Sequence, residues 1–302
     1  MNILHIWDQA GVACILAKYQ QLSGHNSKVI VTCTYDKFGM YSFYHEYVQV
    51  VDPRSLVSTC LIEAENADVI HVHGRVDLLF RLRKKFDRSK KIILHYHGTD
   101  LRGLKKMPQL PNHSLLSDIT LFSKTVVGRS YYNIVGRSRH ARAQKLSDFV
   151  IVATPDLLPL AENAIYLPNP IDTDHFKRCL DMESSKDAPS KKILMISNDA
   201  IDTELVLAYC RNRGLDNSIE VYDRIKNPIS YANMPNFLRK YSTYLDVRFI
   251  NGKLISGISK TALESLACGL SIIDYDLKQR KGFPPEHDPR NVVCSLFNIY
   301  CN

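Results

Sequence analysis

The feature that most constrains the fold of this chain is an alternation of strand-like and helix-like segments that stops once and then begins again. In the first half, short apolar runs typical of buried strands are separated by amphipathic segments such as 10–22. The strand-like runs lie at 2–7, 28–33, 67–73, 91–96, 148–153 and 164–167. Strands that alternate with helices predict a parallel sheet covered by helices on both faces.

The second half of the chain resumes the alternation after a polar interruption. Residues 177–191 are rich in Asp, Glu, Ser and Lys and offer little to bury, so they are the candidate linker. Later strands and helices are expected at 192–196, 203–213, 218–222, 234–240, 244–249, 260–268 and 270–274. A chain of 302 residues is long enough for two domains that each bury a core. We therefore expect an α/β fold of two Rossmann-like domains facing across a cleft, with residues 1–180 in the first and 181–302 in a smaller second.

Composition and cysteine usage favour a cytoplasmic globular protein. Hydrophobic residues make up 45% of the chain and charged residues 23%, as in ordinary globular proteins. No apolar run approaches the ~18 residues of a membrane span, and Asp8 interrupts the N-terminal segment, which argues against a secretory signal. The eight cysteines are scattered without a Cys-x-x-Cys pair, which predicts reduced thiols rather than a zinc site.

The net charge of +8 raises the question of an anionic partner. Basic residues cluster at 81–85, 90–91, 105–106 and 137–142. Such runs are typical of solvated faces, and the alternative is attraction to lipid headgroups or to nucleic acid. Because the sequence has no zinc-finger spacing and no RNA-binding aromatic motif, nucleic acid is not the expected partner.

Residues 256–270 carry the strongest indication of a ligand site. A loop containing Ser and Gly runs directly into a short amphipathic helix that begins near Ser259. The first free N–H groups of a helix carry partial positive charge and suit a phosphate, and Lys260 adds a full charge there. Glu264, one turn further on, can accept hydrogen bonds from sugar hydroxyls. We predict a pocket for a nucleotide-linked sugar, and its donor-binding residues would be Ser256, Gly257, Ser259, Lys260, Thr261 and Glu264.

The same segment resembles the donor-binding motif of retaining glycosyltransferases with the two-domain GT-B fold, specifically glycosyltransferase family 4. The family pattern has a Glu, a Gly-rich loop and a second Glu eight positions on, followed by small residues and a pair such as Cys-Gly. Residues 264–269 match the second half of this pattern. Ser256 stands at the position of the first Glu, which in the family contacts the donor sugar. The resemblance extends from Asn2 to about Asp274.

A second departure from the family concerns the cations that hold the donor diphosphate. Many relatives supply an Arg and a Lys just after the first strand of the second domain, where residues 197–202 contain neither. Arg224, after the predicted strand 218–222, and Lys260 are the candidates to replace this charge. Relatives also often end in a helix that crosses back onto the first domain. Because 282–289 is loop-like and only a short tail follows, we expect this helix to be curtailed or lost.

Two loops of the first domain resemble family segments that approach the donor. The loop 8–13 resembles the Gly-rich loop that closes over the diphosphate, with Gly11 present and Ala10 in place of a second Gly; a plain tight turn is the alternative. Residues 95–103 resemble a His-Gly-Thr-Asp segment that lies near the transferred sugar. This likeness implies that His97 binds a sugar hydroxyl and that Asp100 orients His97 or the acceptor.

Other segments have structural readings beside functional ones. Residues 154–158 and 167–176 resemble interdomain segments of the family; they would shape the cleft edge and the hinge, or only direct the chain between domains. His71 and His73 are expected to pack within their strand. We set aside a metal site built from His71, His73, His95 and His97, because family enzymes generally need no metal. No cofactor is expected.

The resemblance implies transfer of a hexose from a UDP- or GDP-sugar to a hydroxyl of a glycan, lipid-linked or protein acceptor, with retention of configuration and without a metal. The catalytic residues would be His97, Asp100 and Lys260, and a donor phosphate oxygen would take the acceptor proton. Many relatives act on lipid-linked acceptors, which favours peripheral contact with the inner membrane face. The departures from the family pattern leave open a catalytically silent sugar-nucleotide- or glycan-binding protein. A sugar-nucleotide epimerase on this fold and a DNA-modifying glucosyltransferase are further alternatives.

Overall fold

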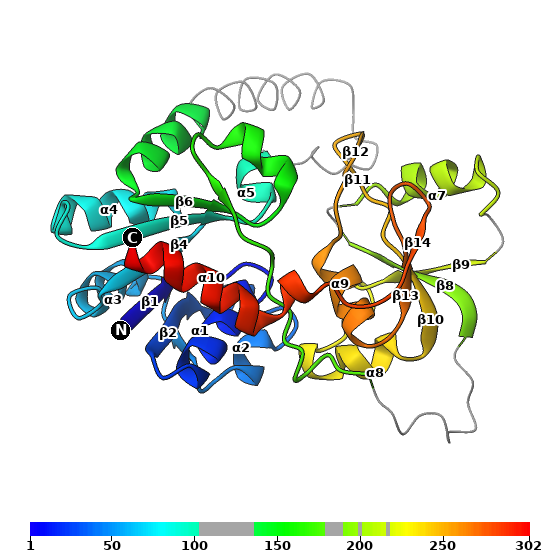
Figure 1. Cartoon of the computed structure of the whole chain (residues 1–302), viewed down its shortest axis with the longest axis horizontal. Coiled ribbons are helices and arrows are strands. Elements are labelled where there is room, and N and C mark those ends of the chain that lie inside the picture. The colour runs from blue at the N-terminus through cyan, green and yellow to red at the C-terminus, as the bar shows by residue number, and fades with distance from the viewer. Residues whose placement is uncertain (103–135, 179–189, 199–200, 216–217) are drawn as a thin grey trace, which may run out of the picture.

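The computed structural model describes residues 1–102, 136–178, 190–198, 201–215 and 218–302, and they form two α/β units (Figure 1). The first unit contains a seven-stranded parallel sheet in the order β3-β2-β1-β4-β5-β6-β7. Its strands are β1 (Asn2–Ile6), β2 (Asn26–Thr32), β3 (Val48–Val51), β4 (Val69–His73), β5 (Lys91–Tyr96), β6 (Phe149–Val152) and β7 (Ile165–Tyr166). Its helices include α1 (Val12–Leu22), α2 (Met40–Phe43), α3 (Leu56–Glu63), α4 (Val76–Phe86) and α5 (Thr99–Arg102), and residues 136–146 are helical as well.

The second unit is a smaller sheet of five strands in the order β14-β13-β10-β8-β9. Its strands are β8 (Ser190–Ser197), β9 (Ile219–Asp223), β10 (Tyr241–Leu245), β13 (Ser271–Ile273) and the antiparallel edge strand β14 (Gln279–Arg280). Its helices are α7 (Thr203–Arg211), α8 (Met234–Leu238) and α9 (Lys260–Ala267), and a hairpin joins β11 (Phe249–Ile250) to β12 (Lys253–Leu254). The predicted two Rossmann-like sheets are therefore present.

Each sheet reverses its strand order once, and these points are where α/β folds place their ligands. The reversal lies between β1 and β4 in the first sheet and between β8 and β10 in the second. The loops that follow these four strands therefore determine the candidate site.

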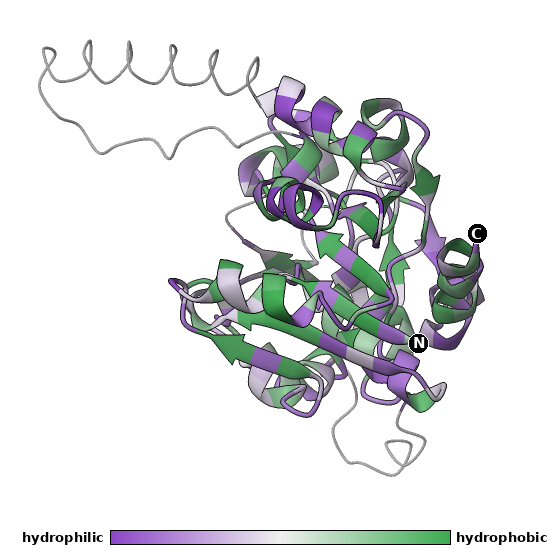
Figure 2. Ribbon diagram, turned by 90° about the vertical axis from the view of Figure 1, so that its left-hand side faces the viewer, coloured by the Kyte–Doolittle hydropathy of each residue, from purple (hydrophilic) through white to green (hydrophobic). Residues whose placement is uncertain are grey.

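Alternating side chains of the first sheet enter two separate cores. Ile3, Val69 and Ile93 face the side covered by α1, whereas Leu4 and Ile70 face the side covered by α3 and α4. The core under α1 continues into the second domain through residues such as Leu194, Ile196 and Leu263. The strands of both sheets are accordingly mostly hydrophobic in the ribbon of Figure 2. The shared core fixes one domain against the other.

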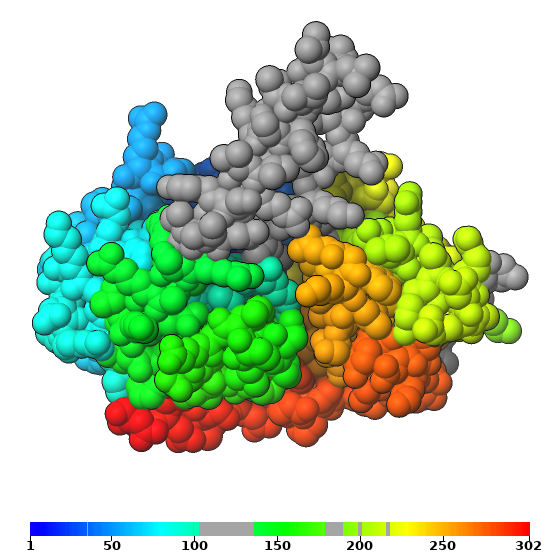
Figure 3. Space-filling view, turned by 90° about the horizontal axis from the view of Figure 1, so that it is seen from above, coloured from blue at the N-terminus to red at the C-terminus, as the bar shows by residue number. Residues whose placement is uncertain are grey.

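The C-terminal helix, α10 (Pro289–Cys301), crosses from the second domain onto the first; it lies across the front in Figure 1 and along the lower edge in Figure 3. The expectation that this helix is curtailed or lost was wrong. Asp288 caps it by accepting a hydrogen bond from the Arg290 N–H, and Pro289 occupies its first turn. Buried side chains at helical spacing then pack it against the first domain, and they are Val292, Val293, Leu296, Ile299 and Tyr300.

Several predictions fall on residues that the structure does not describe, including the basic pair 105–106 and most of the linker, 179–189. None of the helices in the described ranges is long and apolar enough to cross a membrane. Seven cysteines in those ranges are unpaired. Arg83, from the basic run 81–85, is buried and donates to the carbonyls of Asp87 and Lys90, so this run is partly structural.

Three residues of the loop between β1 and α1 have positive φ angles, in the left-handed region of backbone conformation. These are Trp7 at φ +72°, Ala10 at +56° and Gly11 at +79°. Only glycine adopts this conformation without a steric cost. Gly11 is also needed for space, because a Cβ there would lie 2.3 Å from Met40 Sδ. Ala10 therefore stands where the family resemblance places a glycine, and its backbone conformation is the one that glycine favours.

We expect Ala10→Gly to raise the free energy of unfolding by about 0.5–1 kcal/mol, because it removes the left-handed strain at φ +56°. Urea unfolding followed by circular dichroism measures the change. Ala17→Gly, inside helix α1, is the matched control and should lower stability by about 1 kcal/mol or more. A loss of stability in both variants would contradict the assignment of strain to Ala10.

Candidate active site

A pocket of about 520 Å³ lies at the carboxyl ends of β8, β9 and β10, at the reversal point of the second sheet. We call it the donor-side pocket. Most of its walls come from the second domain, and Lys37 and Phe38 of the first domain complete it. Its lining residues are Lys37, Phe38, Ile196, Asn198, Ile201, Arg224, Ile225, Pro228, Tyr244, Arg248, Ile250, Ser259 and Thr261.

The amino end of helix α9 borders this pocket through Ser259 and Thr261. The Ser259 hydroxyl caps the helix by accepting a hydrogen bond from the Ala262 N–H at 3.1 Å. The Ser259 N–H donates to Asp246 Oδ2 at 2.8 Å. The N–H groups of Lys260 and Thr261 make no hydrogen bond within the described residues. They supply the partial positive charge that favours an anion.

Basic side chains from three different elements add full charges to the donor-side pocket. Arg224, predicted from the sequence, follows β9, and its guanidinium carbon lies 3.8 Å from the centroid of the Phe38 ring. Burial lowers the pKa of Arg224, and the nearby Glu264 carboxylate opposes that shift. Arg248 donates to the Gly257 carbonyl at 2.7 Å and pairs with the buried Asp246.

The sequence analysis missed two of these pocket cations, Arg248 and Lys37. Arg248 had an available signal, because it lies three residues beyond the end of a buried strand. Lys37 had none, since it belongs to a first-domain loop that only the packing of the two domains brings to this pocket. The Phe38 carbonyl accepts a hydrogen bond from the Tyr231 N–H at 2.7 Å, which holds that loop against the second domain.

The structure pairs Lys260 with Glu264 instead of placing either in the lining of the donor-side pocket. Lys260 Nζ lies 2.5 Å from Glu264 Oε1, and Glu264 is only 5% exposed. Lys260 Nζ also lies 5.6 Å from the centroid of the Tyr231 ring. Ser256 and Gly257 precede the helix and are likewise outside the lining, although the Gly257 carbonyl holds Arg248.

A second pocket of about 510 Å³ lies at the reversal point of the first sheet. We call it the acceptor-side pocket. It is lined by Trp7, Asp8, Gln9, Ala10, Gly11, Asp36, Lys37, Phe38, Met40, Tyr41, His97, Gly98 and Arg102. Two residues, Lys37 and Phe38, line both pockets, so the two spaces meet at this loop.

Two of the predicted first-domain residues, Gly11 and His97, line the acceptor-side pocket. The Gly11 N–H donates to Asp8 at 2.8 Å, and the same carboxylate accepts from the Ala13 N–H at 2.8 Å. The buried Asp8 therefore occupies the amino end of α1. Burial raises the pKa of Asp8, while these backbone N–H groups act in the opposite direction.

His97 is half-buried, and its Nε2 lies 2.9 Å from His73 Nδ1. Burial lowers the pKa of His97 to about 3, so its imidazole is neutral at pH 7. Asp100 does not contact this ring; its carboxylate accepts hydrogen bonds from the backbone N–H groups of His97 at 2.9 Å and Gly98 at 2.7 Å. Asp100 thus positions the loop that carries His97.

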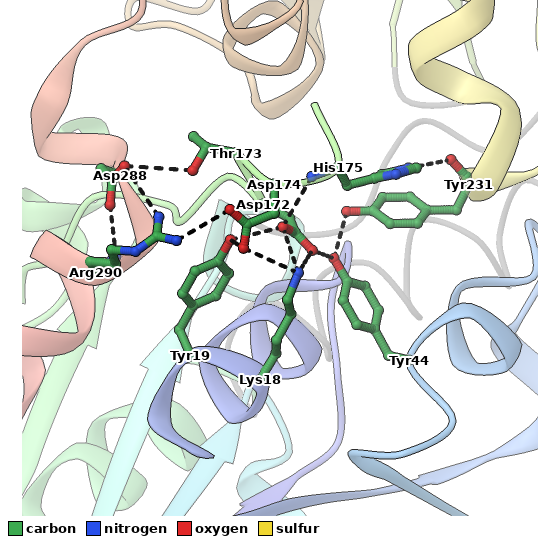
Figure 4. Close-up of polar contacts among 10 residues, drawn as sticks. All are labelled: Lys18, Tyr19, Tyr44, Asp172, Thr173, Asp174, His175, Tyr231, Asp288 and Arg290. Carbon is green, nitrogen blue, oxygen red and sulfur yellow. Dashed lines mark hydrogen bonds and ion pairs between the residues drawn. The ribbon is translucent and has the colours of Figure 1, made fainter. Parts of the chain in front are cut away.

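The interdomain segment around Asp172 is anchored by a buried polar network (Figure 4). The Asp172 carboxylate accepts hydrogen bonds from Lys18 Nζ at 2.8 Å, Tyr19 Oη at 2.9 Å and Tyr44 Oη at 2.8 Å. Tyr44 in turn lies 2.9 Å from the hydroxyl of Tyr231 in the second domain. This network joins the connecting segment to both domains.

No protein-family model and no curated protein sequence matches this chain. Solved structures with low identity do match over almost its full length. HepE from Anabaena, in complex with UDP and glucose, aligns with a TM-score of 0.53 at 12% identity, covering 98% of this chain and 90% of that one. An alpha-glucosyltransferase in complex with UDP and a 13-mer DNA containing an HMU base aligns at 0.56 and 11% identity, with 100% and 91% covered.

Sucrose-phosphate synthase from Thermosynechococcus elongatus aligns with a TM-score of 0.52 at 10% identity, and 100% of this chain and 90% of that one are covered. These neighbours are GT-B glycosyltransferases. Likeness at this level of identity establishes the fold, and the chain therefore has the GT-B fold that the sequence predicted.

Proposed function

We propose that this protein is a glycosyltransferase that moves a hexose from a UDP- or GDP-sugar to an acceptor hydroxyl with retention of configuration. One observation carries the proposal above the others. A pocket at the reversal point of the second sheet combines a helix amino end with the cations Lys37, Arg224 and Arg248, and it meets a second pocket at Lys37 and Phe38. A diphosphate in the first pocket would therefore leave its sugar facing the second.

The chemistry follows from where negative charge develops during transfer. As the glycosidic bond breaks, charge grows on the leaving diphosphate, and the N–H groups of Lys260 and Thr261 with the three cations stabilise it. A donor phosphate oxygen takes the acceptor proton, so no protein base is required. Because protein cations neutralise the diphosphate, no divalent metal is required there either. His97 contacts the transferred sugar from the acceptor-side pocket. Exclusion of water by the two domains limits hydrolysis.

The buried pair of Lys260 and Glu264 gives these residues a specific part in donor binding. Glu264 receives a charge-assisted hydrogen bond from Lys260, which fixes the position of its carboxylate. We assign Glu264 to the ribose hydroxyls, which would have to reach it from beyond the lining of the donor-side pocket, with Lys260 as the group that orients it. This reading gives Lys260 a positioning role in place of the direct phosphate contact expected from the sequence.

The acceptor hydroxyl belongs in this proposal to a glycan, a protein or a lipid-linked molecule at an anionic membrane surface. Two basic runs lie side by side, because Arg142 stacks over the ring of Phe80 at 5.6 Å. The exposed cations on these runs are Arg81, Lys84, Lys85, Arg137, Arg139 and Arg142. Exposed cations of this kind would attract anionic headgroups. One structural neighbour was crystallised with DNA, which makes a DNA acceptor the competing possibility.

Incubation of the purified protein with UDP-, GDP-, ADP- and dTDP-sugars tests the proposal. We expect one UDP- or GDP-sugar to raise the melting temperature and to release nucleotide when glycan, lipid or DNA acceptors are supplied. Added Mg²⁺ or Mn²⁺ should change the rate by less than about twofold, since protein cations neutralise the diphosphate. Binding without release under every condition would instead establish the silent sugar-nucleotide-binding protein.

Glu264→Ala tests the assignment of the ribose contact. We expect donor affinity to fall at least about 10-fold, because a buried charge-assisted contact is lost. Isothermal titration with the donor identified above measures the change. Glu204→Ala, an exposed glutamate in the first turn of α7, is the control and should bind normally. Unchanged affinity in Glu264→Ala would remove this residue from the donor site.

A further inference from the structure

Five histidines gather on one face of the first sheet, behind the wall of the acceptor-side pocket. They are His5 on β1, His71 and His73 on β4, His95 on β5 and His97 just beyond β5. Strand register places His5 beside His71 and His73 beside His95. Because side chains two residues apart share a face, the rings form one layer. His5, His71, His73 and His95 are at most 1% exposed.

Some of these rings have a hydrogen-bond partner at both nitrogens, and others have a nitrogen without one. His5 contacts Gln20 Oε1 at 2.8 Å and His73 Nε2 at 3.0 Å. His71 contacts the Tyr300 hydroxyl at 2.8 Å and His95 Nδ1 at 3.1 Å. Two buried ring nitrogens, His95 Nε2 and His97 Nδ1, have no partner within the described residues. Buried polar atoms without partners are uncommon and call for an explanation.

Three of the rings converge closely enough to hold one ion. A ring nitrogen from each of His73, His95 and His97 lies within 4.8 Å of those of the other two. His73 Nδ1 and His97 Nε2 are 2.9 Å apart. A tetrahedral zinc ion with its usual bond lengths requires its ligand nitrogens to be roughly 3.3 Å apart. This separation is longer than the 2.9 Å between His73 and His97 and shorter than the 4.8 Å limit for the group. The rings would have to rotate for their nitrogens to reach this spacing.

We propose that His73, His95 and His97 bind a divalent transition-metal ion, with zinc as the best-fitting member of the class. Imidazole is a preferred ligand for zinc, copper and nickel. His5 and His71 complete the arrangement by contacting the far nitrogens of His73 and His95. Such outer contacts fix the orientation of metal-binding histidines. The ion would use His95 Nε2, the nitrogen that otherwise lacks a partner.

This site goes beyond the proposed transfer reaction and shares one residue with it, because His97 belongs to both. It lies behind the acceptor-side pocket, which His97 lines, whereas the diphosphate cations line the donor-side pocket. This set of ligands also differs from the four histidines, His71, His73, His95 and His97, that the sequence suggested as a metal site and that we set aside. His5 joins the cluster through strand register, and His71 becomes a supporting ring because both of its nitrogens are occupied.

Cobalt titration of the metal-stripped full-length protein tests the site. We expect one Co²⁺ per chain, visible absorption bands typical of tetrahedral coordination, displacement by Zn²⁺, and a metal-dependent rise in melting temperature. The exposed His45 serves as control, and His45→Gln should bind as the unmodified protein does. His5→Gln should weaken binding about 10–100-fold by loss of the supporting contact.

His73→Gln and His95→Gln should each abolish the cobalt bands while circular dichroism remains that of the folded protein. Bands that persist in both variants would overturn the proposal. If either variant fails to fold, metal uptake by the unmodified protein tests the proposal instead. A stripped chain that takes up no stoichiometric Co²⁺ or Zn²⁺ and shows no thermal shift would exclude the site.

Discussion

Replacement of Asp172 by alanine should lower the free energy of unfolding by about 3 kcal/mol. The carboxylate is fully buried and accepts hydrogen bonds from Lys18, Tyr19 and Tyr44 (Figure 4). Its removal leaves the largely buried Lys18 ammonium group without this acceptor, while Tyr19 keeps only Asp174 and Tyr44 keeps only Tyr231 as a hydrogen-bond partner among these residues. The cost of such unpaired groups exceeds the net value of the original contacts. Urea unfolding monitored by tryptophan fluorescence and circular dichroism measures the loss.

Asp174→Ala is the matched control for this experiment. Asp174 lies two residues away and also contacts Tyr19 and Arg290, but its side chain is 48% exposed. Exposed pairs contribute little, so this variant should lose less than about 1 kcal/mol. Equal losses in the two variants would contradict the role of burial at Asp172. The comparison also tests whether the interdomain segment is an anchor or only a path for the chain.

Replacement of Lys37 by alanine should lower kcat/KM for sugar transfer by about 100-fold, comparable to removal of one preorganised charge donor. Lys37 and Phe38 are the residues common to both pockets, and the bond that breaks would lie where those pockets meet. Because charge develops there only during transfer, kcat should fall more than donor affinity. Steady-state kinetics together with titration of the donor separates the two effects.

Lys226→Ala supplies the control for Lys37, since its side chain is 80% exposed and it lines neither pocket. It should leave both constants within about twofold, because an exposed charge that lines neither pocket contributes little. Lys37→Arg should restore part of kcat, because it retains the positive charge. Full activity in Lys37→Ala, with transfer intact in the unmodified protein, would remove Lys37 from the mechanism without affecting the proposed reaction.

The alternation of apolar and amphipathic segments was sufficient to predict both Rossmann-like domains. Strand and helix formation depends on local spacing of apolar side chains, which is visible in the sequence. The terminal helix was missed although its local signals were present, namely the Asp288–Pro289 start and the apolar spacing up to Tyr300. The preceding segment 282–289 contains one glycine and three prolines, which are typical of a loop and obscure the start of the helix.

The candidate site was predictable only in part, and the reason differs between residues. Ser259, Thr261 and Arg224 all line the donor-side pocket; Arg224 directly follows strand β9, and the other two lie at the amino end of helix α9. Lys260 and Glu264 are four residues apart and share one helix face. The structure turns that face toward Tyr231 and away from the pocket lining, and the two side chains form an ion pair with each other. Helical periodicity defines a face but cannot tell which way packing will turn it.

The sequence alone determined the local elements of this protein: two runs of strand and helix, a capped helix start at Ser259 and a loop that needs glycine at Gly11. Each depends on residues close together in the chain. Tertiary structure decided the rest. Domain packing brought Lys37 to the donor-side pocket, and strand register gathered His5, His73 and His95 into one layer. These contacts join residues that are far apart in the sequence. They depend on the shared core and on the strand order of the sheet, which a local sequence pattern does not reveal.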